Sequence, residues 1–194
     1  MKVLGISGSP RRMGNSELLL DECLKGAESR GAELEKIILA DLKITPCLEL
    51  NVCYDKGECP IKDDMKGLYP KLLEADYVVV SSPIFFYTVT AFTKAFIDRC
   101  QALWATKYIL KQIPIGGKKR KGIFISVGAT RGRRLFEGVK LTMKYFFDAI
   151  DAEYSGELLI RGIEKKGEIK KHPTALKDAF MLGKNLVRER EVKV

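Results

Sequence analysis

Short runs of apolar residues alternate along the chain with longer amphipathic segments. The apolar runs predict five strands, at residues 3–7, 34–39, 77–81, 122–127 and 158–160. Helical spacing predicts helices over residues 16–30, 90–104, 134–150 and 174–190, and a further helix opening at residue 63. Strands that alternate with helices predict an α/β fold with a doubly wound, five-stranded parallel sheet. Five strands favour the strand order 2-1-3-4-5.

The length and the unpatterned middle of the chain suggest how it is organised. The 194 residues suit one domain, which we predict to span residues 1–194. Residues 44–65 form a predicted cysteine-bearing loop inserted after the second strand. No apolar run approaches the roughly 20 residues of a membrane helix, and the first residues do not resemble a signal peptide. We therefore expect a cytoplasmic protein with no membrane partner.

The formal net charge of +9 limits the classes of partner. No recognisable nucleic-acid-binding module accompanies this charge, so we expect no nucleic-acid partner. The densest basic run covers residues 118–121. It is interpreted as a solvated loop, or else as a docking site for an acidic redox partner or a phosphorylated nicotinamide cofactor.

The segment after the first predicted strand has the composition of a phosphate-binding loop. Ser7, Ser9 and Ser16 provide hydroxyl donors, and Arg11 or its neighbour provides a positive charge. Asn15 opens the following helix, whose free N–H groups favour an anion. These residues are therefore candidate ligands for a phosphate group, although an ordinary strand-to-helix turn has a similar composition.

The glycine spacing in this loop argues against two common nucleotide sites. Residues 5–9 do not fit the dinucleotide pattern G-x-G-x-x-G. The glycines at positions 8 and 14 are one residue too far apart for a triphosphate loop, and Asn15 stands where its lysine is required. A hydroxyl-rich loop without that lysine favours a terminal monophosphate.

The same loop carries a resemblance to a known family. Gly-Ser-Pro-Arg at 8–11 with Gly-Asn-Ser at 14–16 resembles the phosphate-loop signature of the NADPH-dependent FMN reductase and iron–sulfur flavoprotein group. The similarity continues at residues 74–77 and 82–86 and covers most of residues 1–135. The resemblance implies a flavodoxin-like fold, bound FMN, and a homodimer or homotetramer in which subunits share the flavin site.

Two further loops are expected at the same edge of the sheet, because they follow the third and fourth predicted strands. The first offers apolar and aromatic surface of the kind that a flavin ring needs, at Pro83, Ile84, Phe85 and Phe86. These side chains are also typical of a protein core. In the second loop, Gly128 and Thr130 are assigned to the ring edge or to nicotinamide docking.

Three of the five cysteines, Cys47, Cys53 and Cys59, lie in the loop over residues 44–65. The segment resembles the one that carries a 4Fe-4S cluster in iron–sulfur flavoproteins, with the pattern C-x2-C-x2-C-x5-C. Such clusters normally take four thiolates, but Leu50 stands at the second ligand position and leucine cannot ligate iron. Three interpretations stay open. The cluster is lost, or it binds through three thiolates and a foreign or water ligand, or the thiols bind zinc or act in redox chemistry.

These features together predict an FMN-dependent oxidoreductase. It would move electrons from NADH, NADPH or a protein donor to a flavin, a quinone or another acceptor. No catalytic side chain is assigned, because flavin reduction needs no side-chain acid or base. The alternative is an iron–sulfur flavoprotein electron carrier, with FMN and a 4Fe-4S cluster, that is reduced by a ferredoxin.

Overall fold

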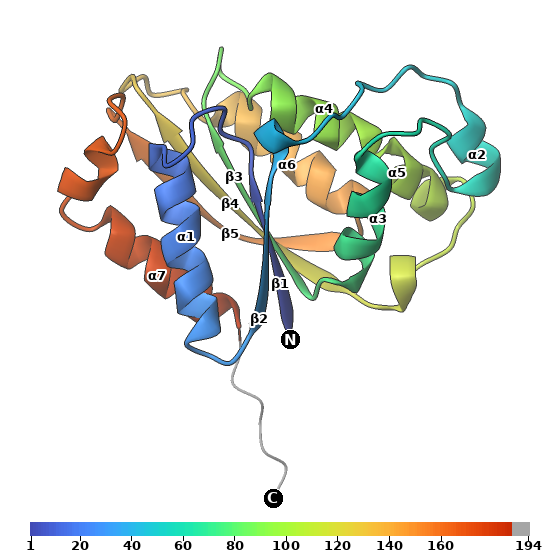
Figure 1. Ribbon diagram of the computed structural model, residues 1–194, viewed down its shortest axis with the longest axis horizontal. Helices are drawn as coiled ribbons and strands as arrows, with labels where there is room; N and C mark the ends of the chain where they lie inside the picture. Colours follow the sequence, from blue (N-terminus) through green and yellow to red (C-terminus); the bar gives the residue numbers. More distant parts are fainter. Residues whose placement is uncertain (188–194) are drawn as a thin grey trace, which may run out of the picture.

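A five-stranded parallel sheet forms the centre of the computed structural model, which describes residues 1–187 (Figure 1). The strands are β1 (Lys2–Ser7), β2 (Glu33–Ile38), β3 (Tyr77–Pro83), β4 (Arg120–Gly128) and β5 (Ala152–Arg161). Their order is β2-β1-β3-β4-β5, with parallel pairing throughout. The predicted fold class and strand order are confirmed. Because β1 lies between β2 and β3, the winding direction reverses there, which is where ligands bind in such sheets.

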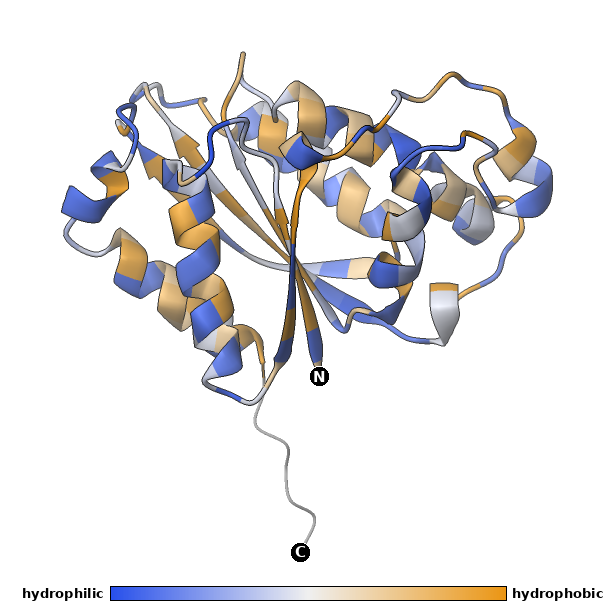
Figure 2. Cartoon of the chain, in the orientation of Figure 1, coloured by the Kyte–Doolittle hydropathy of each residue, from blue (hydrophilic) through white to orange (hydrophobic). Residues whose placement is uncertain are grey.

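Helices cover both faces of the sheet, and each face has its own apolar core. One face carries α1 (Asn15–Glu28), the short helix η3 (Glu168–Lys171) and α7 (Ala175–Leu186). The other carries α3 (Met65–Glu74), α4 (Ala91–Arg99), α5 (Gln101–Tyr108) and α6 (Glu137–Ala149). The helices alternate between hydrophobic and hydrophilic stretches, as amphipathic helices in contact with a sheet must (Figure 2). Within residues 1–187, no helix is long and apolar enough to cross a membrane.

The helices α1 and α7 pack side by side with their backbones in close approach (Figure 1). A Cβ atom on Gly183 would lie 1.8 Å from the carbonyl oxygen of Cys23, and one on Gly26 would lie 1.9 Å from that of Phe180. Only glycine fits at these two positions. The last helix therefore holds α1, and with it the loop that precedes α1, against the sheet.

Several elements differ from the sequence prediction at their ends. The helix predicted over residues 90–104 is broken at Cys100, and the fifth strand is longer than the apolar run 158–160. The last residues of the helix predicted over 174–190 lie outside the described part of the chain. The short elements α2 (Val52–Lys56), η1 (Leu39–Asp41) and η2 (Ile115–Gly117) were not predicted. They are too short to produce a detectable period.

Candidate functional site

A cavity of about 210 Å³ opens at the edge of the sheet where β1, β3, β4 and β5 end. It adjoins the N-terminus of α1. Its lining comes from four loops: Ser9, Pro10, Arg11, Gly14, Asn15 and Ser16; Pro83, Ile84 and Phe85; Val127 and Ala129; and Ile163, Glu164 and Lys166. The first three loops are those in which the sequence predicted site residues.

Two buried hydroxyl groups of the loop between β1 and α1 have no hydrogen-bond partner in the described structure. They belong to Ser7 and Ser16, which are each 1% exposed. A buried donor without a partner costs about 1–3 kcal/mol, so such groups are usually satisfied by something. The first turn of α1 also has no side-chain cap, because Gly14 stands at the capping position. This set of free donors at a helix N-terminus fits a phosphate group.

The remaining residues of this loop, which we call the phosphate loop (residues 7–16), fix its shape. Ser9 Oγ accepts a hydrogen bond from the Arg11 N–H at 3.1 Å. Thr90 Oγ1 donates to the carbonyl of Gly8 at 2.6 Å, and a Cβ on Gly8 would lie 1.8 Å from Thr93 Oγ1. The glycine is therefore required by the close approach of the first turn of α4.

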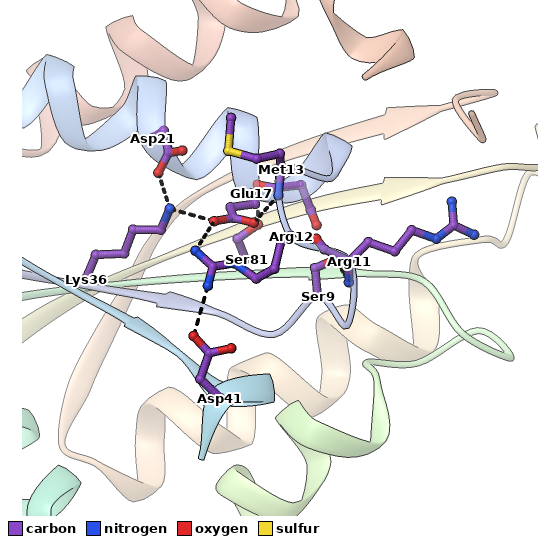
Figure 3. A network of polar contacts seen from close by, with 10 residues as sticks. Ser9, Arg11, Arg12, Met13, Glu17, Asp21, Lys36, Asp41 and Ser81 are labelled. Carbon is purple, nitrogen blue, oxygen red and sulfur yellow. Dashed lines mark hydrogen bonds and ion pairs between the residues drawn. The ribbon is translucent and has the colours of Figure 1, made fainter. Parts of the chain in front are cut away.

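The buried carboxylate of Glu17 is bonded to the middle of the phosphate loop (Figure 3). It accepts the N–H of Met13 at 2.6 Å and the amine of Lys36 at 2.9 Å. Met13 has a φ of 56°, so its left-handed backbone is held by this bond. Burial alone would raise the pKa of Glu17, but the bonds from Lys36 and Met13 outweigh it and lower the pKa. The sequence reasoning missed Glu17, whose only signal was an acidic residue in the first helical turn.

The two arginines of the phosphate loop have different surroundings. Arg12 pairs with Asp41 at 2.9 Å and with Glu17 at 3.6 Å, so its charge is already neutralised. Arg11 extends away from this network (Figure 3) and lines the cavity. Within residues 1–187 Arg11 forms no ion pair, and its guanidinium donates only to the carbonyl of Glu164, at 3.5 Å. Of the two arginines, Arg11 is the one with charge available for an anion.

The loop after β3 is a tight hairpin with two aromatic residues at its tip. Phe85 and Thr88 exchange backbone hydrogen bonds at 2.9 and 3.0 Å, leaving Phe86 and Tyr87 as the two turn residues. Both have positive φ, at 48° and 62°, as this turn type requires. Phe86 is fully exposed, whereas Phe85 lines the cavity. In Figure 1 this hairpin projects beyond the rest of the sheet edge.

The structure thus places the predicted site residues unevenly around the cavity. Ser9, Arg11, Asn15, Ser16, Pro83, Ile84 and Phe85 line it, whereas Ser7, Phe86, Gly128 and Thr130 do not. Gly128 is instead packed against Leu135. A Cβ atom on Gly128 would lie 2.6 Å from a side-chain carbon of Leu135. The sequence reasoning missed Ile163, Glu164 and Lys166, which follow β5. The available signal was that a fifth parallel strand ends at the same edge.

The cysteine-bearing loop lines a second, larger cavity of about 530 Å³. Cys47, Cys53 and Cys59 face it together with Cys100 of the helix break, and Leu50 lines it while being 54% exposed. Burial and the neighbouring thiols raise the pKa of Cys53. Within residues 1–187, no three cysteine, histidine or acidic side chains are close enough to hold a metal ion. With leucine at position 50, this donor set does not fit a four-thiolate cluster.

The two ends of the cysteine-bearing loop are held together by a buried ion pair. Arg99 donates to the carbonyl of Thr45 at 2.8 Å and to the Asp63 carboxylate at 2.6 Å. Asp63 also accepts the N–H groups of Thr45 and Met65. Burial would raise the pKa of Asp63, but the hydrogen bonds from Arg99 and Thr45 lower it overall. The base of the loop is therefore fixed to the end of α4.

Comparisons with known proteins agree with this geometry. A family model described as NADPH-dependent FMN reductase matches residues 1–140. An iron–sulfur flavoprotein of Methanocaldococcus jannaschii is 40% identical over 131 residues, which cover 68% of this chain and 64% of the relative. An iron–sulfur flavoprotein of Methanosarcina thermophila is 34% identical over 131 residues, covering 68% of this chain and 65% of the relative. The chain therefore matches less than two thirds of the length of these relatives.

Among solved structures, the fold is similar to that of the NAD(P)H:quinone oxidoreductase from Methanothermobacter marburgensis. The TM-score is 0.74, the sequence identity is 17%, and the alignment covers 98% of each chain. At this identity the likeness concerns the fold. The family that the phosphate loop resembled in sequence is thus the family whose model matches.

Proposed function

Because the chain belongs to the NADPH-dependent FMN reductase family, we propose that it is an FMN-dependent oxidoreductase. It takes electrons from NADH, NADPH or a protein donor and passes them to a flavin, a quinone or another acceptor. The observation that carries the proposal is the buried, unpartnered hydroxyl of Ser16, which lines the cavity beside the uncapped N-terminus of α1. Bound FMN supplies the hydride- and electron-transfer chemistry, and the chain supplies binding and orientation.

In this proposal the phosphate loop holds the FMN phosphate. Ser16 donates its hydroxyl, and Arg11 supplies a charge that no carboxylate of residues 1–187 neutralises. The role of Ser7, whose hydroxyl does not line the cavity, stays a prediction. Ser9 keeps the loop in shape through its bonds with the Arg11 backbone, while its hydroxyl lines the cavity. The first-turn N–H groups of α1, beginning at Asn15, complete the anion site.

The apolar part of the site is proposed to pack against the flavin ring. Pro83, Ile84 and Phe85 form one wall of the cavity, and the exposed ring of Phe86 stands at the tip above them. These side chains exclude water and orient the ring without taking part in proton transfer. The assignments of Gly128 and Thr130 to the ring edge or to nicotinamide docking stay predictions.

A homodimer or homotetramer is also part of the proposal. Its support is the exposure of large apolar side chains around the cysteine cavity, where Leu48, Leu50 and Tyr145 are each more than half exposed. Sedimentation equilibrium measures the mass of the assembly, and a monomer at micromolar concentration contradicts this part. The expected cytoplasmic location stays a prediction.

Flavin binding by the purified protein tests the proposal directly. We expect the protein, refolded with FMN and desalted, to keep a bound flavin spectrum and to be reduced by NADPH or NADH under anaerobic conditions. Ser16→Ala should weaken FMN binding about tenfold, because a phosphate loses one hydrogen bond. The matched control is Ser155→Ala, whose hydroxyl bonds only to its own strand. A protein that retains no flavin under these conditions refutes the proposal.

The second candidate function is that of an iron–sulfur flavoprotein electron carrier reduced by a ferredoxin. It is favoured by the three cysteines of the loop, which line one cavity, and opposed by Leu50. The two functions differ in metal content. A clean flavin spectrum without iron or sulfide in an anaerobic preparation excludes the carrier, whereas stoichiometric iron and sulfide support it. Leu50→Cys supplies the missing thiol, so cluster uptake by this variant alone would identify position 50 as the cause.

A further inference from the structure

The loop between β5 and η3, residues 162–167, lies against the phosphate loop and closes the cavity from a side that the sequence did not predict. Ile163, Glu164 and Lys166 line the same cavity as Arg11 and Ser16. The site therefore has a fourth wall, supplied by a segment about 150 residues away in the sequence from the phosphate loop.

Two hydrogen bonds fasten this wall to the phosphate loop, and a third fastens the adjoining helix η3. Asn15 Nδ2 donates to the carbonyl of Lys165 at 2.9 Å, and the N–H of Ile169 donates to Asn15 Oδ1 at 3.2 Å. Arg11 donates to the carbonyl of Glu164 at 3.5 Å. Both polar atoms of the Asn15 side chain are used in this way. Asn15 can therefore offer a phosphate its backbone N–H and the second hydrogen of Nδ2, while its amide group stays tied to this wall.

The wall also has an internal support that gives it a defined shape. The carboxylate of Glu168 accepts the N–H groups of Glu164 and Lys165, at 2.9 and 2.8 Å. Those two bonds lower the pKa of Glu168. Gly162 and Gly167, at either end, have φ values of 73° and 76°, which let the chain turn sharply there. Lys166 is thus held on a short, tied turn at the cavity.

The charge balance around the cavity leaves room for a second cation, since the lining that residues 1–187 provide holds one carboxylate, that of Glu164, beside Arg11. A phosphate monoester carries close to two negative charges at neutral pH. Arg12 is committed to Glu17 and Asp41, so in the phosphate loop only Arg11 has charge to offer. Lys166 lines the cavity and forms no ion pair within residues 1–187. A lysine acts on phosphate as a point charge, which suits an exposed position at the mouth of a site.

We propose that Lys166 binds the phosphate of the flavin together with Arg11, and that Asn15 is a positioning residue that fastens the Lys166 turn to the phosphate loop. This rests on the proposed function, since it names further residues for the same FMN site. It makes the β5–η3 turn part of what distinguishes FMN from riboflavin.

Titration of the flavin-free protein with FMN and with riboflavin tests the proposal. Lys166→Gln should weaken FMN binding about fivefold and leave riboflavin binding unchanged, because only FMN carries the phosphate. Raising the salt concentration should also weaken FMN binding less in this variant than in the wild type. The matched control is Lys165→Gln, which removes an exposed charge one residue away that does not line the cavity. It should change FMN binding less than twofold.

The positioning role of Asn15 is tested by a double-mutant cycle. Asn15→Ala should weaken FMN binding in the wild type, and it should add little once Lys166→Gln is present, because both changes remove the same contact. Fully additive losses would show that Asn15 acts on its own. Wild-type FMN affinity in Lys166→Gln, or equal loss of FMN and riboflavin, overturns the role of Lys166. If the wild-type protein binds neither flavin, the proposed function fails instead.

Discussion

Phe86 combines two properties that rarely occur together: a left-handed backbone, with φ at 48°, and a side chain that is fully exposed. A residue with a Cβ atom pays roughly 1–2 kcal/mol in this conformation, and asparagine tolerates it much better. Full exposure means that the ring contributes almost no packing to the folded, flavin-free chain. Phe86→Asn should therefore stabilise the flavin-free protein by about 1 kcal/mol.

The measurement is urea unfolding of the flavin-free protein, followed by circular dichroism, with thermal unfolding beside it. In a chain of this size, 1 kcal/mol corresponds to a rise in Tm of roughly 2–4 °C. Phe86→Ala is the matched control. It removes the ring but keeps a side chain that is unfavourable in the left-handed region, so its stability should stay within about 0.5 kcal/mol of wild type.

The reasoning is refuted if Phe86→Asn is no more stable than Phe86→Ala, since the turn would then carry no strain for asparagine to relieve. Flavin binding gives a second, opposite expectation. If the ring of Phe86 contacts bound flavin, both variants should bind FMN more weakly than wild type, although one of them is more stable. Strain kept at a binding site in this manner is a common sign of function.

Other substitutions test the supports of the site. Arg99→Met should lower the free energy of unfolding by about 3 kcal/mol, because the Asp63 carboxylate stays buried without its partner. The double variant with Asp63→Leu should lose clearly less stability in the same urea unfolding experiment. The lowered pKa of Glu17 stabilises the folded chain at pH values above the ordinary glutamate pKa of about 4.3, and this contribution is lost as the pH falls through the folded pKa. The free energies of unfolding of the wild type and Glu17→Gln should therefore differ at pH 7 and converge towards pH 3. A difference that stays constant with pH would contradict this. Gly183→Ala should cost about 2–3 kcal/mol of stability, because it forces α1 and α7 apart. Gly67→Ala, in open space within α3, should stabilise the chain slightly. Equal effects of these two changes in thermal unfolding would disprove the close approach of α1 and α7.

The sheet was predictable because short apolar segments, longest in β3 and β4, alternate with longer amphipathic ones. The buried run at residues 77–81 and the alternation of strands and helices were enough for the strand order. Helix boundaries were less accessible, because the break at Cys100 leaves helical spacing on both sides. Next to the break, Arg99 binds a partner 36 residues away, a contact that the sequence does not reveal.

The site was predictable as far as its signals were local. The hydroxyl residues and the positive end of α1 follow one another in the sequence, so the phosphate loop is visible there. Glu17 also binds Lys36 of β2, and Lys166 lines the same cavity as Arg11, and both arrangements depend on the fold. The same holds for the choice between Arg11 and Arg12, which depends on the position of Asp41.

The buried pair of Arg99 and Asp63 also separates the anchoring of the cysteine-bearing loop from its thiols. It joins Thr45 to Asp63 at the neck of the cysteine-bearing loop, and it does so with atoms that lie outside the segment carrying the thiols. The neck of the loop is therefore held closed independently of its three thiols, so the anchoring of the loop and its chemistry depend on different residues.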